Sequence, residues 1–282
     1  MDSIQEFLED EDPMPEGVEN LFLGAFLGGA IGDALGSFCE GWPRERILEV
    51  KDLTAWYRDR KPRKALPNPH WSMKGGAYTD DTQQTLVLAE SVLACGGADA
   101  ADLADRFLKM WRDNELYGYG RAFKQTMDRL DSGTPWTEAA STDMPSNGAV
   151  MKIAPIGLWH WQQGEEIRED AIALSQVTHR DPRAVAAAVS IAHVVGHLVT
   201  HRPLDTNEVL DVAEWSARPI HEPTGELIGQ VRRLLQLPED EAYDEMLSLP
   251  ESAFTRGQGF PGEAPISAVV ALEAFLRTPR EF

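Results

Sequence analysis

The chain has 282 residues, of which 43% are hydrophobic, and its formal net charge is −20. This length and composition suit one large globular domain with a sizeable core. The acidic charge excludes a nucleic-acid backbone as the main partner, because there is no basic excess to neutralise phosphates. The two cysteines, Cys39 and Cys95, form no CxxC pattern, so neither a zinc finger nor a disulfide framework is expected. Two cysteines of this kind are compatible with a reducing compartment, and we expect a cytoplasmic location.

The N-terminal residues 1–17 are acidic and lack the basic segment of a signal peptide, so we interpret them as a mobile leader. The apolar stretch LFLGAFLGGAIGDALGSF follows and is long enough to cross a membrane. It contains Asp33 and has no positive flank to orient it, so we expect a helix of the folded domain and no membrane contact. The folded domain is predicted to span 18–282.

Glycines recur at every fourth position of this first helix, over 18–38, and therefore share one face: Gly24, Gly28, Gly32 and Gly36. Each glycine costs about 1 kcal/mol relative to alanine inside a helix. Close packing of neighbouring backbones would offset this cost, so the pattern predicts a central helix with other helices against it. Within it, Asp33 is interpreted as a local hydrogen-bonding partner and Glu40 as a solvated helix end.

Helical periodicity dominates the rest of the chain, and strand signals are weak. Further helices are predicted over 79–95, 100–113, 119–131, 148–162, 165–176, 182–200, 205–216, 223–235 and 264–277. The long, proline-containing stretch 41–75 is interpreted as a functional or mobile loop. The sequence therefore predicts an all-α fold.

The segment YTDDTQQTLVLAESVL begins with oxygen-bearing side chains at the start of a helix. Thr79, Asp80 and Asp81 offer one hydroxyl and two carboxylates, which suit a hard cation such as Mg²⁺ or Mn²⁺. The alternative is a plain N-cap, in which Thr79 caps and the two acids complement the helix dipole. The residues alone leave both interpretations open.

Two further segments place polar residues just before helices. SNGAVMK, residues 146–152, is a small polar loop of the kind that binds phosphate through backbone N–H groups, with a plain cap as the alternative. VTHRDP, residues 177–182, places His179 before a helix whose start is marked by Asp181 and Pro182. A single histidine in this position is more often structural than functional.

Taken in order and at their separations, four segments resemble the ADP-ribosylglycohydrolase family: GAFLGGAIGDALGSFCE, YTDDTQQTLVLAESVL, SNGAVMK and THRDP. The resemblance covers 21–282. It implies an all-α, single-domain orthogonal helical bundle with a two-metal site of Mg²⁺ or Mn²⁺. It also implies hydrolysis of the bond between ADP-ribose and a side chain of a modified protein, with arginine as the leading candidate.

The same resemblance implies a role for individual residues. Thr79, Asp80 and Asp81 would be metal ligands, and Glu40 would face the metals. Asp81 and Glu40 would be the catalytic residues. The residues that would bind the substrate are Ser146, Asn147, Gly148, Ala149, Met151 and His179.

One family feature is absent from the sequence. Members of the family carry a D-x-D-T segment near the C-terminus that completes the metal site, and the 282 residues contain none. The final stretch APISAVVALEAFLRTPREF resembles the helix that precedes that segment, so we expect C-terminal truncation or a loss of activity. The alternatives to a metal-dependent hydrolase are a catalytically impaired protein that binds ADP-ribose or another partner, and a metal-free sugar hydrolase.

Overall fold

The structure, a computed structural model, describes residues 17–37, 39–40, 42–50, 77–114, 116–249 and 262–279. Helices dominate this part of the chain, where the β-type pairing is limited to two isolated bridges, Ser141 with His179 and Ser146 with Glu263. The predicted all-α fold is therefore confirmed. The predicted leader, apart from Gly17, and most of the predicted loop 41–75 lie outside the described residues.

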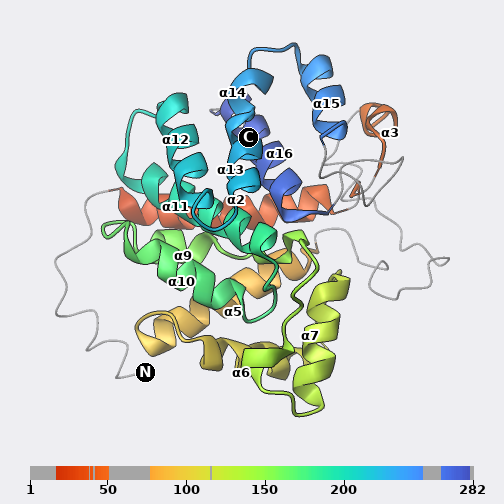
Figure 1. Ribbon diagram of the computed structural model, residues 1–282, viewed down its shortest axis with the longest axis vertical. Helices are drawn as coiled ribbons and strands as arrows, with labels where there is room; N and C mark the ends of the chain where they lie inside the picture. The colour runs from red at the N-terminus through yellow and green to blue at the C-terminus, as the bar shows by residue number, and fades with distance from the viewer. Residues whose placement is uncertain are drawn as a thin grey trace.

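The described part of the chain is a succession of helices. In order they are α2 (Val18–Gly36), α3 (Arg44–Leu48), α5 (Asp80–Cys95), α6 (Ala100–Arg112), α7 (Arg121–Asp131), α8 (Trp136–Ala139), the 3₁₀ turn η2 (Asn147–Ala149), α9 (Ala154–Trp159), α10 (Glu166–Ser175), α11 (Pro182–Thr200), α12 (Thr206–Ala217), α13 (Glu222–Gly229), α14 (Val231–Leu234), α15 (Glu239–Leu247) and α16 (Ala264–Arg277). Helices α5 to α7 lie at one end, α12 to α16 lie at the other, and α9 to α11 lie between them (Figure 1).

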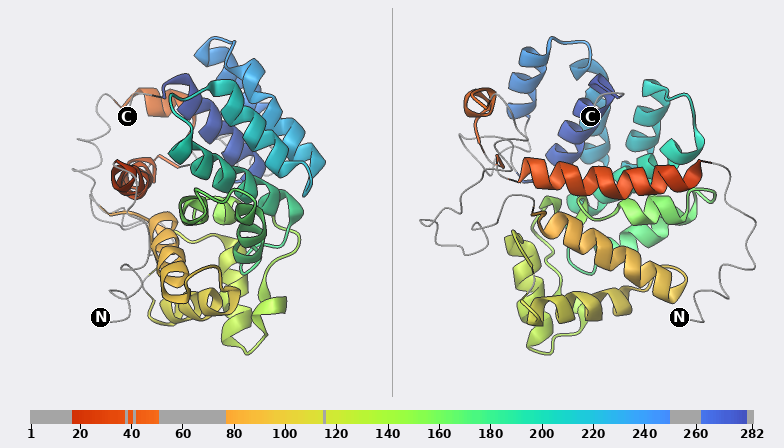
Figure 2. Two further views of the ribbon diagram at one scale, coloured as in Figure 1. Left: turned by 90° about the vertical axis from the view of Figure 1, so that its left-hand side faces the viewer. Right: turned by 180° about the vertical axis from the view of Figure 1, so that it is seen from behind.

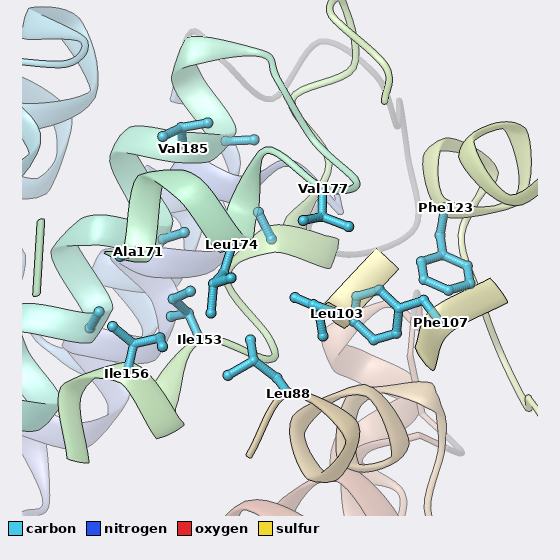
Figure 3. Packing of buried hydrophobic residues seen from close by; sticks show 14 of the residues in the cluster. Leu88, Leu103, Phe107, Phe123, Ile153, Ile156, Ala171, Leu174, Val177 and Val185 are labelled. Atoms are coloured by element: carbon cyan, nitrogen blue, oxygen red, sulfur yellow. The ribbon is translucent and has the colours of Figure 1, made fainter. Parts of the chain in front are cut away.

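Helix α11 joins two clusters of buried apolar side chains. Val185 and Val189 belong to a cluster with α5, α6, α7 and α10, part of which is shown in Figure 3. Ala186 and Val194 belong to a second cluster, with α12 to α16. A helix that is apolar on all sides is expected in the middle of a core. The position of α11 follows from its composition.

The crossing of α9 and α11 requires glycine. A Cβ atom on Gly157 would overlap the carbonyl oxygen of Ala192 and would lie 2.9 Å from the amide nitrogen of Gly196. A Cβ atom on Gly196 would lie 3.0 Å from the carbonyl oxygen of Gly157. The two backbones are therefore in direct contact, which only residues without a Cβ allow.

Helix α2 lies on the surface, so the prediction that it is the central helix is wrong. Only Val18 and Ala34 are buried, and α2 runs across one face of the molecule (Figure 2, right). A Cβ atom on Gly24, Gly32 or Gly36 would meet nothing within 4 Å among the described residues. Its exposed apolar side chains are Leu23, Leu27 and Ile31, with exposed fractions of 56%, 51% and 44%.

Two described helices, α2 and α11, have the length and the apolar composition of a membrane-spanning helix. Most of α11 is buried among other helices. Near the end of α2, Asp33 hydrogen-bonds to Thr79 and Thr82 at the start of α5. These contacts join α2 to the helical bundle.

Some predicted helix boundaries are wrong. The predicted helix 148–162 is replaced by η2 and the short α9, because Pro155 has no amide proton and starts a new helix. The predicted helix 223–235 is divided into α13 and α14. Helices α3 and α15 were not predicted, since each is short and carries several charged residues.

A surface position for α2 makes its apolar side chains dispensable for stability. Replacing Leu27 by serine is expected to change the free energy of unfolding by at most about 0.5 kcal/mol. Replacing Leu88, which is fully buried on α5, by alanine is expected to cost about 2–5 kcal/mol. Urea unfolding measures both variants, and a comparable loss in the two would contradict the exposure of α2.

Candidate active site

The start of α5 is a capped helix end. The Thr79 hydroxyl oxygen accepts a hydrogen bond from the amide of Asp81, with a distance of 3.3 Å. Asp80 and Asp81 occupy the first turn, where the helix dipole favours negative charge. The cap interpretation of this segment is thereby confirmed. A cap does not exclude a cation site, since both carboxylates keep oxygen atoms for further contacts.

Asp33 joins α2 to this helix end. Its carboxylate accepts hydrogen bonds from the amide and hydroxyl of Thr79, at 2.8 and 2.7 Å, and from those of Thr82, at 3.2 and 2.6 Å. The first amides of a helix have no partner inside the helix, and Asp33 supplies one for two of them. The interpretation of Asp33 as a local partner within its own helix is therefore wrong, because its partners lie 46 and 49 residues away.

Burial and neighbouring negative charge raise the pKa of both Asp80 and Asp81. Asp80 is buried, and its pKa is raised well above the usual range by loss of water and then by the charge of Asp81. Burial also raises the pKa of Asp81, followed by the charge of Asp33. The Thr79 hydroxyl lies within 2.7 Å of Asp33 and 2.9 Å of Asp81 and can donate its proton to only one at a time. The cluster thus holds unneutralised negative charge.

Glu40 lies in the turn beyond α2, which ends at Gly36. Its side chain reaches solvent, yet the pKa of Glu40 is raised, first by loss of water around the carboxylate and then by the charges of Asp81 and Asp33. The structure thereby brings Glu40 into electrostatic contact with residues from the start of α5.

The donors of this acidic cluster, which comprises Asp33, Glu40, Thr79, Asp80 and Asp81, suit a hard cation in chemical type. All are oxygen atoms, and a divalent ion would offset the mutual repulsion of the carboxylates. Among the described residues, no group of three or more His, Cys, Asp or Glu side chains is already arranged to hold a metal ion. The cluster therefore fits Mg²⁺ or Mn²⁺ as part of a ligand set.

The predicted substrate loop packs against His179. The hydroxyl oxygen of Ser146 lies 2.9 Å from Nε2 of His179. A Cβ atom on Gly148 would lie 2.7 Å from Cε1 of the same ring, so this close approach requires glycine. Asn147 donates its amide to the carbonyl of Gly262, at 2.9 Å, which holds η2 against the start of α16.

The loop also contacts the helix that carries the acids. The Thr85 hydroxyl, on α5, donates to the carbonyl of Met151 at 3.3 Å, and Ala149 is fully buried. The structure therefore places all the predicted site residues in two adjoining groups, one around the start of α5 and one around η2. Their roles in binding and catalysis stay predictions.

Lys152 is a site residue that the sequence analysis did not single out for a role. It is fully buried, and its ammonium group donates to Gln84, Gly148 and Thr178. Burial lowers the pKa of Lys152 to about 7, while the charges of Asp80 and Asp81 act in the opposite direction. A lysine between apolar residues in a predicted helix was the available signal, since fully buried lysines are rare.

Known proteins are similar to this chain in sequence and in fold. The family model for ADP-ribosylglycohydrolase matches residues 14–282. An ADP-ribosyl-[dinitrogen reductase] glycohydrolase of Rhodospirillum rubrum is 29% identical over 66% of the chain. An ADP-ribosylarginine hydrolase Tri1 of Serratia proteamaculans is 26% identical over 62% of the chain. A solved ADP-ribosylglycohydrolase-related protein complex matches 93% of the chain with a TM-score of 0.59 and 25% identity.

The relatives are longer than the matched region. It spans 60% of the Rhodospirillum protein and 46% of the Serratia protein, and the structural match covers 77% of the solved chain. The chain thus spans about half the length of the curated relatives that it matches. The family model nevertheless extends over nearly all of its residues. The chain belongs to the ADP-ribosylglycohydrolase family.

Proposed function

We propose that this protein hydrolyses the bond between ADP-ribose and a side chain of a modified protein, with arginine as the acceptor. The observation that carries the proposal is the acidic cluster beside the loop of Ser146 and its partner His179. The names of the Rhodospirillum and Serratia relatives support this substrate class. A cytoplasmic setting is supported by the two free cysteines, Cys39 and Cys95.

In this proposal, Thr79, Asp80, Asp81 and Glu40 hold Mg²⁺ or Mn²⁺. A bound divalent ion supplies Lewis-acid stabilisation of developing charge and lowers the pKa of its water. Asp33 orients Thr79 and the first turn of α5 by its four hydrogen bonds.

The chain's own residues have separate tasks in the reaction. The loop that contains Ser146, Asn147, Gly148 and Ala149 binds the pyrophosphate and ribose, and the absence of a side chain at Gly148 lets the His179 ring pack against this loop. Glu40 accepts a proton from the attacking water as a carboxylate general base. Cleavage of the glycosidic bond then passes through a transition state that resembles an oxocarbenium ion.

A second candidate function is binding of ADP-ribose without hydrolysis. One contact favours it: the Asp80 carboxylate accepts a hydrogen bond from the Gln84 amide at 2.8 Å. This contact occupies one acceptor position of the Asp80 carboxylate and so competes with a cation for it.

Release of ADP-ribose from an ADP-ribosylarginine protein, with Mg²⁺ or Mn²⁺ present, tests the proposal directly. The chain is expected to release it, and Asp81→Asn is expected to lower the rate at least about 100-fold. The control Asp105→Asn changes an exposed acid on α6 and should retain the rate. Binding of ADP-ribose without release would favour the second candidate, and loss of both would contradict both.

A further inference from the structure

The three protons of the Lys152 ammonium group have three acceptors. They are donated to the carbonyl of Gly148 at 2.7 Å, the side-chain oxygen of Gln84 at 3.0 Å and the hydroxyl of Thr178 at 2.9 Å. An ammonium group has no lone pair and therefore acts only as a donor. Thr178 accepts this hydrogen bond from Lys152. Its own hydroxyl proton is buried and needs an acceptor atom elsewhere, because buried polar groups are rarely left without a partner.

That atom is Nδ1 of His179, which lies 2.8 Å from the Thr178 hydroxyl. Burial and the charge of Lys152 lower the pKa of His179 well below its usual range, so the ring is neutral. A ring nitrogen that accepts a hydrogen bond carries no proton, and the single ring proton of His179 therefore lies on Nε2.

The opposite nitrogen of the ring then determines the role of Ser146. Nε2 of His179 lies 2.9 Å from the Ser146 hydroxyl and donates to it. Because Ser146 accepts this hydrogen bond, its own hydroxyl proton is free for another acceptor. With the other tautomer, Ser146 would donate to His179 and would offer a ligand only lone pairs.

We infer that Lys152 is a positioning residue that acts through Thr178 and His179 to direct the hydroxyl proton of Ser146 toward an anionic oxygen of the ligand. The ligand oxygen belongs to the pyrophosphate of ADP-ribose, and in this respect the inference rests on the proposed function. Buried hydrogen bonds that link Lys152, Thr178 and His179 fix the direction in which each group donates. Lys152 can therefore influence Ser146 without touching it.

The surroundings of Lys152 support its charged form. Asp80 and Asp81 on α5 are the acids that act on it, and burial opposes them to leave a pKa of about 7. The rings of Phe107 and Phe123 have their centroids 5.3 and 5.8 Å from the ammonium nitrogen, within reach of cation–π attraction. The three acceptors within 3.0 Å and the two ring faces suit the ammonium form of Lys152.

Long-range ¹H–¹⁵N spectra of the labelled full chain at pH 6 report which ring nitrogen of His179 carries the proton. His179→Gln identifies its signals. The expected result is a proton on Nε2 in the unmodified chain and in Lys152→Arg, which keeps a charged donor. In Lys152→Met the Thr178 hydroxyl can accept from Nδ1, so a substantial fraction of the proton is expected on Nδ1.

Calorimetric titration with ADP-ribose completes the test. Lys152→Arg should stay within about threefold of the unmodified affinity, whereas Lys152→Met and Ser146→Ala should lose about tenfold. A proton on Nδ1 in the unmodified chain, or an unchanged tautomer and affinity in Lys152→Met, would overturn the inference. If the tautomers behave as expected and no form binds ADP-ribose, the proposed function fails while the positioning role of Lys152 stands.

Discussion

Replacing Asp33 by alanine is expected to lower the free energy of unfolding by about 3 kcal/mol, since a hydrogen bond to a charged group contributes about 1.5–3 kcal/mol and the loss of several such bonds is partly offset by relief of the repulsion between Asp33 and Asp81. The change removes the acceptor for both the amides and the hydroxyls of Thr79 and Thr82. It also leaves the first turn of α5 without its contact to α2. Divalent cations should therefore bind at least about tenfold more weakly at Asp80 and Asp81.

Urea unfolding and calorimetric titration with Mn²⁺ measure the two effects of this change. Asp105→Ala is a matched control, because Asp105 is an exposed acid on α6 and should change the free energy of unfolding by at most about 0.5 kcal/mol. Equal effects of the Asp33 and Asp105 changes would show that Asp33 does not organise the site.

Replacing Gly157 by alanine is expected to destabilise the protein by about 3 kcal/mol or more, even though it adds only one methyl group. The new Cβ would overlap the Ala192 carbonyl and press on the amide nitrogen of Gly196. Both are backbone atoms of α11, so no side-chain rotation relieves the overlap. Separation of α9 from α11 would reduce packing in the central cluster, which includes Ile153 and Ile156.

The control for this change is Gly164→Ala, where a Cβ atom would meet nothing within 4 Å and the backbone is not left-handed. This variant should be neutral or slightly stabilised, because alanine reduces the conformational entropy of the unfolded chain. Thermal and urea unfolding compare the two variants. A loss at Gly157 no larger than that at Gly164 would contradict the close contact of α9 and α11.

Helix type was predictable from sequence, and helix placement was not. Most predicted helices appear with shifted ends, because periodicity and capping are local properties of the chain. The glycines of α2 suggested close packing, yet the close contact lies between Gly157 and Gly196. Glycine spacing permits close approach without selecting the partner. The neighbour is determined by tertiary contacts that no short segment encodes.

In the candidate site, too, residue types were predictable from the sequence and their distant partners were not. Thr79, Asp80 and Asp81 were predicted from their type and from the resemblance, and the structure places Glu40 within electrostatic reach of them. Asp33 and Lys152 were missed in their roles because their partners lie 46 and 68 residues away, respectively. A charged side chain within an apolar segment was the available signal for both.

Calorimetric titration of the full chain with Mn²⁺ tests most directly whether the acidic cluster binds a divalent cation. The account predicts saturable binding that weakens at least about tenfold in Asp81→Asn, which removes one charged ligand, and stays unchanged in Asp105→Asn. Failure of the correctly folded chain to bind Mn²⁺, or equal affinity in Asp81→Asn, would contradict it.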